Sequence, residues 1–403
     1  MKSQYWPRGK INEFQEERLR DVFTDASRVP YWKDMVSSLS ASGAAIHQLA
    51  RFPVTTKKEL VEAGEFKTTD PAYAWKSDQD RTSGSTGRPF SFYTDWGASL
   101  RSYAVTERIF RTLTKGTRYP IVYMRSRERN GFTFWKHTWL YSKGQRDVAE
   151  RIDELVRISK NFKNGFVLYA YTSSLLEVAR QVEARRLELP LRAAMAAGEH
   201  LTNAQRQYIE RVLKTQVFTM YASREAGYLA FECEFHTLHL NEEWAYVEIV
   251  DEHGTALPYG KEGRIVVTTF DNRAMPFIRY DIGDRGVMSD VACQCGRTLR
   301  TIELKGRTAE LIELSGGRRV ALLDTSSTID RFWDAVRQFQ LVQTGVHHFT
   351  MRVVPGPSFA SRKMELEAAL TELFGEPISI MWEFVETIPD APSGKAQYFL
   401  RTF

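Results

Sequence analysis

The chain has 403 residues, of which 43% are hydrophobic and 26% are charged, and its formal net charge is +5. This composition is typical of globular proteins and excludes a disordered chain, and the length favours two or three domains. The small positive charge fits a protein that binds anionic small molecules and argues against a protein that binds nucleic acid.

No segment is long and apolar enough to span a bilayer, so we expect no membrane span. The first twenty residues lack the apolar core of a secretory signal. Three cysteines cannot form a disulfide framework, which indicates a reducing compartment. We therefore predict a cytoplasmic protein.

Residues 10–65 predict helices. Ile11, Phe14, Leu19 and Val22 recur at roughly helical spacing. In "FPVTTKKELVEAG" a hydroxyl residue precedes a helical turn and a glycine ends it.

The next feature is the loop in "RTSGSTGRPFSFYTD" (81–95), which leads into the predicted strand "FSFYT". Backbone N–H groups of a glycine-rich turn can converge on a phosphate, and Ser and Thr hydroxyls add donors. The sequence is not a Walker A loop, because GxxxxGK[ST] is absent. The alternative is a mobile Gly/Ser connection without a ligand.

Between residues 119 and 227 strand-like and helix-like segments alternate. Strands are predicted in "YPIVYMR", "FVLYAY" and "QVFTMYAS", and helices in "VAERIDELVRISK", "SLLEVARQVEARR" (with Ser173 as its cap) and "LTNAQRQYIERVLK". Such alternation predicts an α/β sheet with helices packed on it.

After residue 235 the pattern becomes rich in strands, and after Gly306 a smaller α+β segment follows. Within that segment we predict a helix in "TIDRFWDAVRQFQ" (328–340), strands in "HHFTMRVV" and "SIMWEFVE", a helix in "SRKMELEAALTELFG" and a final loop in "IPDAPSGKAQYFLRTF". The predicted fold class is α/β, with a large N-terminal domain (1–305) of sheets flanked by helices and a small mobile α+β domain (306–403).

Four further segments follow the loop in a fixed order: "YASREAG", "YDIGDRG", "LKGRTAELIEL" and "APSGKAQYFL". Glu225 comes just past a strand, where a carboxylate can hold a cation, and Asp284 could accept both hydroxyls of a ribose. Arg307 lies at the predicted domain joint, and Lys395 lies on a glycine loop. Each alone fits an ordinary surface or turn residue, but all five segments in order make coincidence a poor explanation.

This set resembles the adenylate-forming superfamily of acyl-CoA synthetases, luciferases and peptide-synthetase adenylation domains. The start "VPYWKD…FPVTTKKEL", the loop "TSGSTG", "YDIGD", "CQCGRTL" and the ending "SGK" are similar to its phenylacetate–CoA ligase and CapK-like branch. The resemblance covers nearly the whole chain. It implies that a carboxylate attacks the α-phosphate of ATP to give an acyl-adenylate and pyrophosphate, and that a thiol, foremost coenzyme A, then displaces AMP.

The resemblance also implies roles for individual residues. Lys395 would bridge the two reacting anions, Glu225 would anchor Mg²⁺, and Asp284 with Arg307 would hold the ribose. Rotation of the small domain between the two half-reactions is implied too, with Arg307 near the hinge and the Gly316–Gly317 loop lining the thiol tunnel. The residues implied to bind ATP are Thr82, Ser83, Gly84, Ser85, Thr86, Gly87, Arg88, Gly198, Glu199, Tyr221, Ala222, Ser223, Asp284 and Arg307.

Three residues depart from the family pattern. Ala222 stands where glycine is usual, Arg224 where Ser or Thr is usual, and Ala309 where relatives commonly have Asp or Lys at the hinge. These departures concern the substrate class and the hinge and leave Glu225, Asp284, Arg307 and Lys395 in place.

All three cysteines fall in two short segments, "FECEFHTLHLNEE" and "ACQCGRT". Cys233, His239, Cys293 and Cys295 supply four soft or borderline ligands, the usual number for a closed structural zinc site. The alternative is a set of reduced, partly buried thiols without a metal.

The substrate and the acceptor stay open. Phe132, Phe134, Trp135, Trp139 and Tyr141 are candidates for an acyl pocket or for the core. The expected partners are a carboxylic acid, ATP and a thiol; a carrier-protein phosphopantetheine, an amine or hydroxyl acceptor, and a second copy of the chain are alternatives. A nucleotide-binding relative without turnover is the competing function class.

Overall fold

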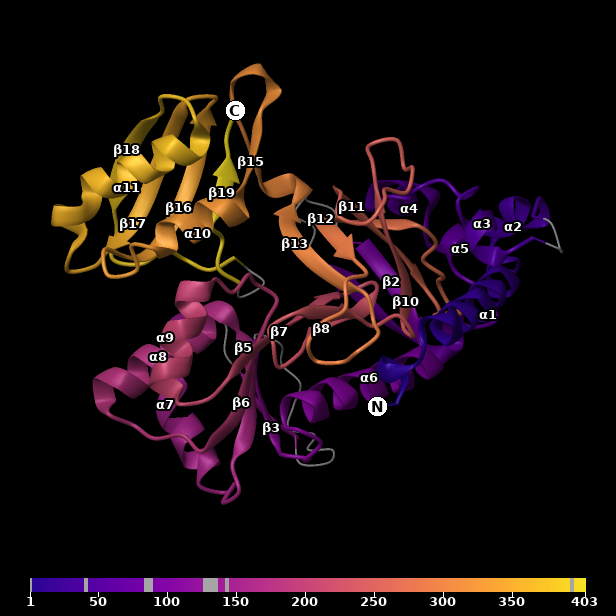
Figure 1. Cartoon of the computed structure of the whole chain (residues 1–403), viewed down its shortest axis with the longest axis horizontal. Coiled ribbons are helices and arrows are strands. Elements are labelled where there is room, and N and C mark those ends of the chain that lie inside the picture. Colours follow the sequence, from indigo (N-terminus) through magenta and orange to yellow (C-terminus); the bar gives the residue numbers. More distant parts are fainter. Residues whose placement is uncertain (1, 40–42, 83–89, 126–136, 142–144, 392–394) are drawn as a thin grey trace. The chain divides into compact units, whose positions relative to one another are not determined.

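The computed structural model in Figure 1 describes residues 2–39, 43–82, 90–125, 137–141, 145–391 and 395–403. The chain forms two compact units, and each unit contains two separate stretches of sequence. The first unit contains Met1–Gly116 and Met220–Lys305, and the second contains Thr117–Thr219 and Gly306–Phe403. Helices and strands are mixed throughout, so the predicted α/β class is confirmed.

The first unit begins with helices that pack around a buried cluster containing Leu19, Val22 and Phe52. The amphipathic spacing of the first helix places its apolar residues on one face, as the sequence predicts. Thr56 and Glu59 form a capping box at the start of the second predicted helix, which ends before Gly64. The helices are η1 (Ser3–Tyr5), α1 (Arg8–Ala26), α2 (Pro30–Ser37), α3 (Ala45–Leu49), α4 (Lys57–Ala63), α5 (Glu65–Thr68), η2 (Ala74–Lys76) and α6 (Trp96–Leu113).

The strands of the first unit form a hairpin, β1–β2, and a sheet in the order β10-β11-β12-β13-β9-β8-β7. The strand β7 passes from the second unit, which contains residues 217–219, into the first. The bounds are β1 (Ser77–Thr82), β2 (Phe90–Asp95), β7 (Val217–Ser223), β8 (Gly227–Glu232), β9 (Leu238–Leu240), β10 (Ala245–Val250), β11 (Glu262–Thr269), β12 (Tyr280–Ser289) and β13 (Thr301–Arg307).

In the second unit, the strands β4, β3, β5, β6 and β7 pair in parallel in this order. Helices α7, α8 and α9 pack against this sheet through Ile152, Val178 and Ile209, in one buried cluster (Figure 1). Parallel strands require such crossover helices. The bounds are β3 (Ile121–Arg125), β4 (His137–Tyr141), α7 (Gln145–Ser159), β5 (Phe166–Tyr171), α8 (Thr172–Arg185), β6 (Leu191–Ala197) and α9 (Asn203–Leu213).

From Gly306 on, the second unit has a hairpin, β14–β15, and a sheet in the order β18-β17-β16-β19. Helices α10 and α11 share a buried cluster with this sheet. The bounds are η3 (Thr308–Glu310), β14 (Leu311–Glu313), η4 (Ser315–Gly317), β15 (Arg319–Ala321), α10 (Leu322–Asp330), β16 (Val336–Gly345), β17 (His348–Pro355), α11 (Phe359–Phe374), β18 (Ser379–Phe384) and β19 (Phe399–Arg401).

Two predictions in this C-terminal part are wrong. The helix predicted over 328–340 ends at Asp330, and Val336 begins β16. Phe339 and Leu341 face the C-terminal core from that strand. In so short a stretch the apolar spacing alone does not distinguish a strand from a helix. The predicted final loop contains the short strand β19, which pairs in parallel with β16. The helix α6 was not predicted.

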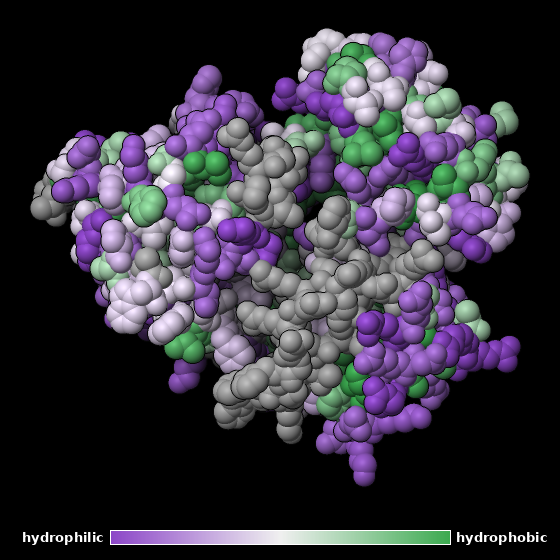
Figure 2. All heavy atoms as spheres, turned by 180° about the vertical axis from the view of Figure 1, so that it is seen from behind, coloured by the Kyte–Doolittle hydropathy of each residue, from purple (hydrophilic) through white to green (hydrophobic). Residues whose placement is uncertain are grey.

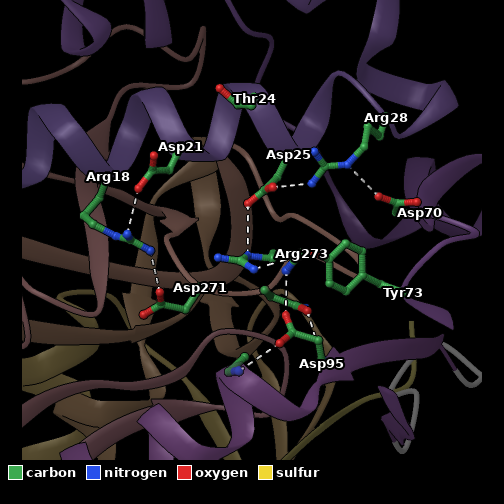
Figure 3. A network of polar contacts seen from close by, with 12 residues as sticks. Arg18, Asp21, Thr24, Asp25, Arg28, Asp70, Tyr73, Asp95, Asp271 and Arg273 are labelled. Atoms are coloured by element: carbon green, nitrogen blue, oxygen red, sulfur yellow. Dashed lines mark hydrogen bonds and ion pairs between the residues drawn. The ribbon is translucent and has the colours of Figure 1, made fainter. Parts of the chain in front are cut away.

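A network of ion pairs joins α1 and the residues just after it to the segment that follows β11 and to Asp70, and hydrogen bonds continue it to Asp95 at the end of β2 (Figure 3). Asp25 lies between Arg28 and Arg273, and Arg18 pairs with Asp271 at 2.6 Å. The buried carboxylate of Asp95, at the end of β2, accepts hydrogen bonds from the backbone N–H groups of Ala98 (3.1 Å) and Arg273 (2.7 Å). Asp95 is therefore both the cap of α6 and the anchor of the strand that follows the glycine-rich loop.

We predict that Asp95→Ala lowers the free energy of unfolding by about 2–4 kcal/mol. The substitution removes a helix cap and leaves the N–H of Arg273 without its acceptor in a buried place. Chemical denaturation measures the change. The control is Asp21→Ala, because Asp21 is half exposed and pairs with Arg18 only within the same helix. Equal small losses in both variants would contradict the anchoring role.

Candidate functional site

The start of β12 is fixed by a buried arginine. Arg279 is only 4% exposed, and its guanidinium donates to both carboxylate oxygens of Glu248 at 3.1 Å. It also donates to the carbonyl oxygens of Phe52 (2.9 Å) and Gly254 (2.7 Å). Burial raises the pKa of Glu248, and the charge of Arg279 opposes that shift. The guanidinium makes four hydrogen bonds to three different residues, which holds the backbone before Tyr280 in place.

A bulge in β12 presents Asp284. Between two of its pairs with β11, β12 has three residues (282–284) where β11 has one. Within the bulge, the N–H of Gly283 donates to the carboxylate of Asp281 at 2.8 Å, and Gly283 has a φ of +80°. The hydroxyl of Tyr221 then donates to Oδ2 of Asp284 at 2.8 Å. Two residues predicted to bind the nucleotide, from β7 and β12, are thus in contact.

The second carboxylate lies in the turn between β7 and β8. Glu225 is partly exposed, and its Oε1 accepts a hydrogen bond from the hydroxyl of buried Tyr280 at 3.4 Å. The turn is closed by Ser223, whose hydroxyl accepts from the N–H of Ala226 at 2.9 Å. Ala222 is exposed at the end of β7. A carboxylate held by one phenol and still accessible is suited to binding a divalent cation.

Arg224 connects this turn to the start of the glycine-rich loop. Its guanidinium donates to both carboxylate oxygens of Asp80 (2.9 and 3.1 Å) and to the carbonyl oxygen of Arg81 (2.6 Å). Both partners lie in β1, whose last residue, Thr82, pairs with Phe90 of β2. Sequence reasoning noted Arg224 only as a departure from the family pattern. The contact could not be predicted, because 143 residues separate Arg224 from Arg81.

The loop residues themselves lie outside the part of the chain that the structure describes. These are Ser83, Gly84, Ser85, Thr86, Gly87 and Arg88. The candidate acyl-pocket residues Phe132, Phe134 and Trp135 also lie outside it, and for Trp139 and Tyr141 only the backbone of β4 is described. Their predicted roles stay predictions.

In the second unit, Gly198 lies against Lys395. A Cβ atom at Gly198 would be 3.0 Å from the ring of Tyr171 and 3.2 Å from Cε of Lys395, and the residue has a φ of +75°. Both the backbone conformation and the space require glycine here. Gly198 follows β6, and Tyr171 is the last residue of β5. Two residues from distant predicted motifs therefore meet at the ends of parallel strands.

Glu199 caps α8 from outside the helix. Its carboxylate accepts from the N–H (2.8 Å) and the hydroxyl (3.1 Å) of Ser173, and from the N–H of Ala396 (2.8 Å). Burial raises the pKa of Glu199, whereas these hydrogen bonds and the charge of Lys395 oppose the shift. The predicted cap role of Ser173 is wrong, because Ser173 lies inside the helix that begins at Thr172. Its N–H is one of the unpaired donors of a helix start, and a distant carboxylate satisfies it.

Arg307 is the last residue of β13 and is exposed. It follows Gly306, where the second unit resumes and the backbone has a φ of +93°. A surface hollow of about 570 Å³ lies at the turn of Gly316 and Gly317. There the hydroxyl of Ser315 and Nε2 of His347 are 2.8 Å apart. The sequence had suggested a tunnel-lining role for this turn, which stays a prediction.

A further carboxylate lies at the end of α10. Oδ2 of Asp330 is buried and has no hydrogen-bond partner within the described ranges. Burial raises the pKa of Asp330 to about 6, although hydrogen bonds to Thr202 and Gln205 at the start of α9 oppose the shift. Burial also raises the pKa of Tyr398 well above its usual range, with the charges of Glu199 and Asp330 acting in the same direction. The carboxyl groups here favour their protonated forms more than exposed ones do.

The four predicted zinc ligands lie together in the first unit. The ligand atoms of Cys233, His239, Cys293 and Cys295 are all within 4.8 Å of one another. The sulfur atoms of Cys233 and Cys293 are 3.9 Å apart, and Sγ of Cys295 is 3.2 Å from Nε2 of His239. Zn–S bonds of about 2.3 Å in a tetrahedral site give sulfur separations of this size. The residues therefore fit a zinc ion.

The surroundings of this cluster also suit a metal. Nδ1 of His239 is 3.2 Å from the carbonyl oxygen of Leu299, an arrangement that directs Nε2 toward the cysteines. His236 is turned away, with Nδ1 3.5 Å from Glu232. Next to the cluster, Arg297 donates to Gln4 at 2.8 Å, which ties the N-terminal segment to the loop of Cys293 and Cys295.

Among the described residues no helix is long and apolar enough to cross a membrane, as expected. On the face shown in Figure 2, hydrophobic residues lie in small groups between hydrophilic ones.

Comparison with known proteins gives concordant results. Residues 312–402 match the family model of the CapK C-terminal domain. The chain is 27% identical to a phenylacetate–coenzyme A ligase of Thermus thermophilus over 329 residues, 77% of this chain and 73% of the relative. It is 22% identical to protein CapK of Staphylococcus aureus over 96% of this chain and 88% of the relative.

A solved structure of 2-hydroxyisobutyryl-CoA ligase in complex with an acyl-adenylate has a similar fold. The TM-score is 0.82 at 16% identity, over 100% of this chain and 91% of the other. Since the identity is low, this similarity concerns the fold.

We predict that Asp330→Asn stabilises the protein at pH 8 and has little effect at pH 4. The folded pKa of about 6 exceeds the ordinary value of 3.8, so the carboxylate lowers stability progressively as the pH rises through this interval. The gain is at most about 3 kcal/mol, because one pKa unit corresponds to about 1.4 kcal/mol. Thermal unfolding at the two pH values measures it.

The control is Asp153→Asn, because Asp153 is 73% exposed in its pair with Arg185. A loss of stability of Asp330→Asn at pH 8 would show instead that the start of α9 stabilises the charged form.

Proposed function

We propose that the chain belongs to the adenylate-forming superfamily, in the branch of the phenylacetate–coenzyme A ligases and CapK, and that it is an AMP-forming acid–thiol ligase. It activates a carboxylic acid with ATP to an acyl-adenylate, with release of pyrophosphate. It then transfers the acyl group to a thiol, for which coenzyme A is the foremost candidate.

The observation that carries the proposal is the convergence of three contacts in the first unit. Arg224 ties the end of β7 to the strand that leads into the glycine-rich loop, Tyr221 contacts Asp284, and Tyr280 contacts Glu225. A phosphate-binding loop, a carboxylate for a ribose and a carboxylate for a cation are the groups that nucleotide activation needs. In this proposal Glu225 would hold Mg²⁺, and the ion would offset negative charge on the phosphates.

In the first step, a carboxylate oxygen of the acid bonds to the α-phosphorus, and the bond from that phosphorus to the bridging oxygen of pyrophosphate breaks. Both reactants are anions, so a cation must reduce their repulsion. Lys395 is proposed for this task, because an ammonium group acts as a compact point charge with three donors. Asp284, supported by Tyr221, and Arg307 are proposed to bind the ribose, and Gly198 to lie along the adenine.

In the second step, the thiol sulfur attacks the acyl carbon, AMP leaves and the thiol proton is released. The hollow at Gly316 and Gly317 is the proposed approach for the thiol arm. The small domain (306–403) is proposed to move between the two steps. A carrier-protein phosphopantetheine, an amine or a hydroxyl are the alternative acceptors.

We also propose that Cys233, His239, Cys293 and Cys295 bind one structural zinc ion. The four ligand atoms, their separations and the hydrogen bond of His239 support this proposal. The ion would hold the turn after β8 against the connection between β12 and β13. Reduced cysteines that bind a metal fit a cytoplasmic protein.

We predict acid-dependent exchange of labelled pyrophosphate into ATP when the protein is incubated with a panel of aromatic and aliphatic carboxylic acids. For any acid that reacts, Lys395→Ala should lower the exchange by about 100-fold or more, because it removes the cation between two anions. Thioester formation from a supplied acyl-adenylate should change by less than about threefold.

The matched control is Lys160→Ala, which removes an exposed lysine of the same unit. Equal loss of both half-reactions in Lys395→Ala would refute the assigned role. The absence of acid-dependent exchange over the whole panel would favour a nucleotide-binding protein without turnover.

We predict about one zinc ion per chain by elemental analysis of protein purified without chelators. Replacing both Cys293 and Cys295 by serine should abolish zinc and lower Tm, because two of four ligands are lost. His236→Ala should retain the metal, since His236 pairs with Glu232. Zinc-free protein with the Tm of the untreated sample would contradict the structural role.

A further inference from the structure

The carboxylate of Glu199 joins two segments that are far apart in sequence. On one side it accepts both donors of Ser173, in the first turn of α8. On the other it accepts the N–H of Ala396, the residue after Lys395. Its own carbonyl oxygen accepts from the hydroxyl of Thr172 at 3.3 Å, which fixes the main chain of Glu199 as well. Glu199 is therefore held rigidly and holds the chain next to Lys395.

The segment that carries Lys395 is anchored at its other end by the C-terminal sheet. The N–H of Leu341 in β16 donates to the carbonyl oxygen of Tyr398 at 2.8 Å, and the side-chain amide of Gln340 donates to the carbonyl oxygen of Gln397 at 2.9 Å. The N–H of Ala391 donates to the carbonyl oxygen of Lys395 at 2.8 Å. Every one of these contacts belongs to the sheet or to the segment itself. The hydrogen bond from the N–H of Ala396 to Glu199 links the backbone of this segment to the stretch 117–219.

Charge and space add to this geometry. The negative charge of Glu199 interacts favourably with Lys395, as the lowering effect of Lys395 on the pKa of Glu199 indicates. A Cβ atom at Gly198 would be only 3.2 Å from Cε of Lys395, so a side chain there would crowd the lysine. The side chain of Lys395 thus passes close to Gly198, and Glu199 holds the backbone of the next residue, Ala396. Two adjacent residues, 198 and 199, together define where the lysine can lie.

We propose that Glu199 is a positioning residue that fixes the Lys395 segment in the arrangement needed for acyl-adenylate formation. This inference rests on the proposed function and gives Glu199 a role different from lining the adenine pocket. Three of the about four acceptor positions of its carboxylate are used by protein donors, so little capacity is left for a nucleotide. Since the contact to Ala396 must break whenever the segment leaves, Glu199 sets the stability of this arrangement.

The experiment compares Glu199→Gln and Glu199→Ala with a matched control, Glu188→Gln, an exposed glutamate of the same unit. The first measurement is amide hydrogen exchange of peptides covering 391–398, in protein without any substrate. Both Glu199 variants should exchange at least about fivefold faster there, because the acceptor of the N–H of Ala396 is weakened or lost. The control and the peptides of β16 and β17 should not change.

The second measurement separates the half-reactions. Pyrophosphate exchange should fall at least about tenfold, with the KM for ATP within about twofold, because substrate binding is retained and only the reacting state is lost. Thioester formation from a supplied acyl-adenylate should stay within about threefold. If no acid supports pyrophosphate exchange, the proposed function fails. The amide hydrogen exchange of residues 391–398 still decides whether Glu199 positions this segment.

The proposal is overturned if the amide hydrogen exchange of residues 391–398 is unchanged in both Glu199 variants. A rise in the KM for ATP without faster hydrogen exchange also overturns it and assigns Glu199 to the nucleotide. Faster exchange throughout α8 and β6 would show general loss of structure. In that case Ser173→Ala, which removes only the hydroxyl partner, replaces the Glu199 variants and should give the same two effects at smaller size.

Discussion

The first unit depends on one buried cation. Arg279 has left-handed backbone geometry, with a φ of +45°, and its guanidinium is paired with Glu248 and with two carbonyl oxygens. Removing one partner of such a pair leaves an uncompensated charge, which typically costs about 3–5 kcal/mol. Because Arg279 immediately precedes Tyr280, this pairing also fixes where β12 begins. The positions of Tyr280, the bulge and Asp284 follow from it.

Much of the fold could be predicted from the sequence, because local patterns decide it. The hydroxyl cap before α4, the glycine that follows it and the apolar spacing of α1 are short-range signals, and the structure confirms all three. The helix predicted over 328–340 failed because Phe332, Val336 and Phe339 recur at helical spacing, although Phe339 and Leu341 also fit the period of two of a strand. Packing in the C-terminal core decided between them, and the sequence offers no local signal for it.

The candidate site divides in the same way. Glu225, Asp284 and Lys395 could be named as candidates because each lies in a short segment with a family resemblance. Their supporting partners were not found, since Arg224 with Asp80, Ser173 with Glu199 and Arg279 with Glu248 are contacts between distant segments. The charge of Arg224 is paired with Asp80 of β1, and no spacing in the sequence predicts that these two residues lie close together. By contrast, the cluster of Cys233, His239, Cys293 and Cys295 is a set of distant residues that was predicted to lie together, because few residue types bind zinc.

The interleaved order of the two units has a consequence for synthesis on the ribosome. Residues 2–116 emerge before residues 220–305, yet Gln4, Arg8 and Arg18 find their partners only near residues 298, 242 and 271. The intervening stretch 117–219 contains neighbouring parallel strands and their crossover helices, so it has mostly local partners when it emerges. Its core can therefore form before the later partners of the N-terminal helices, about 200 residues further along the chain, have been synthesised. The buried cluster around Leu19, Trp32 and Phe52 is mostly local in sequence, so the positions next to Phe270 and Ile278 are the part of it that stays uncovered during that interval.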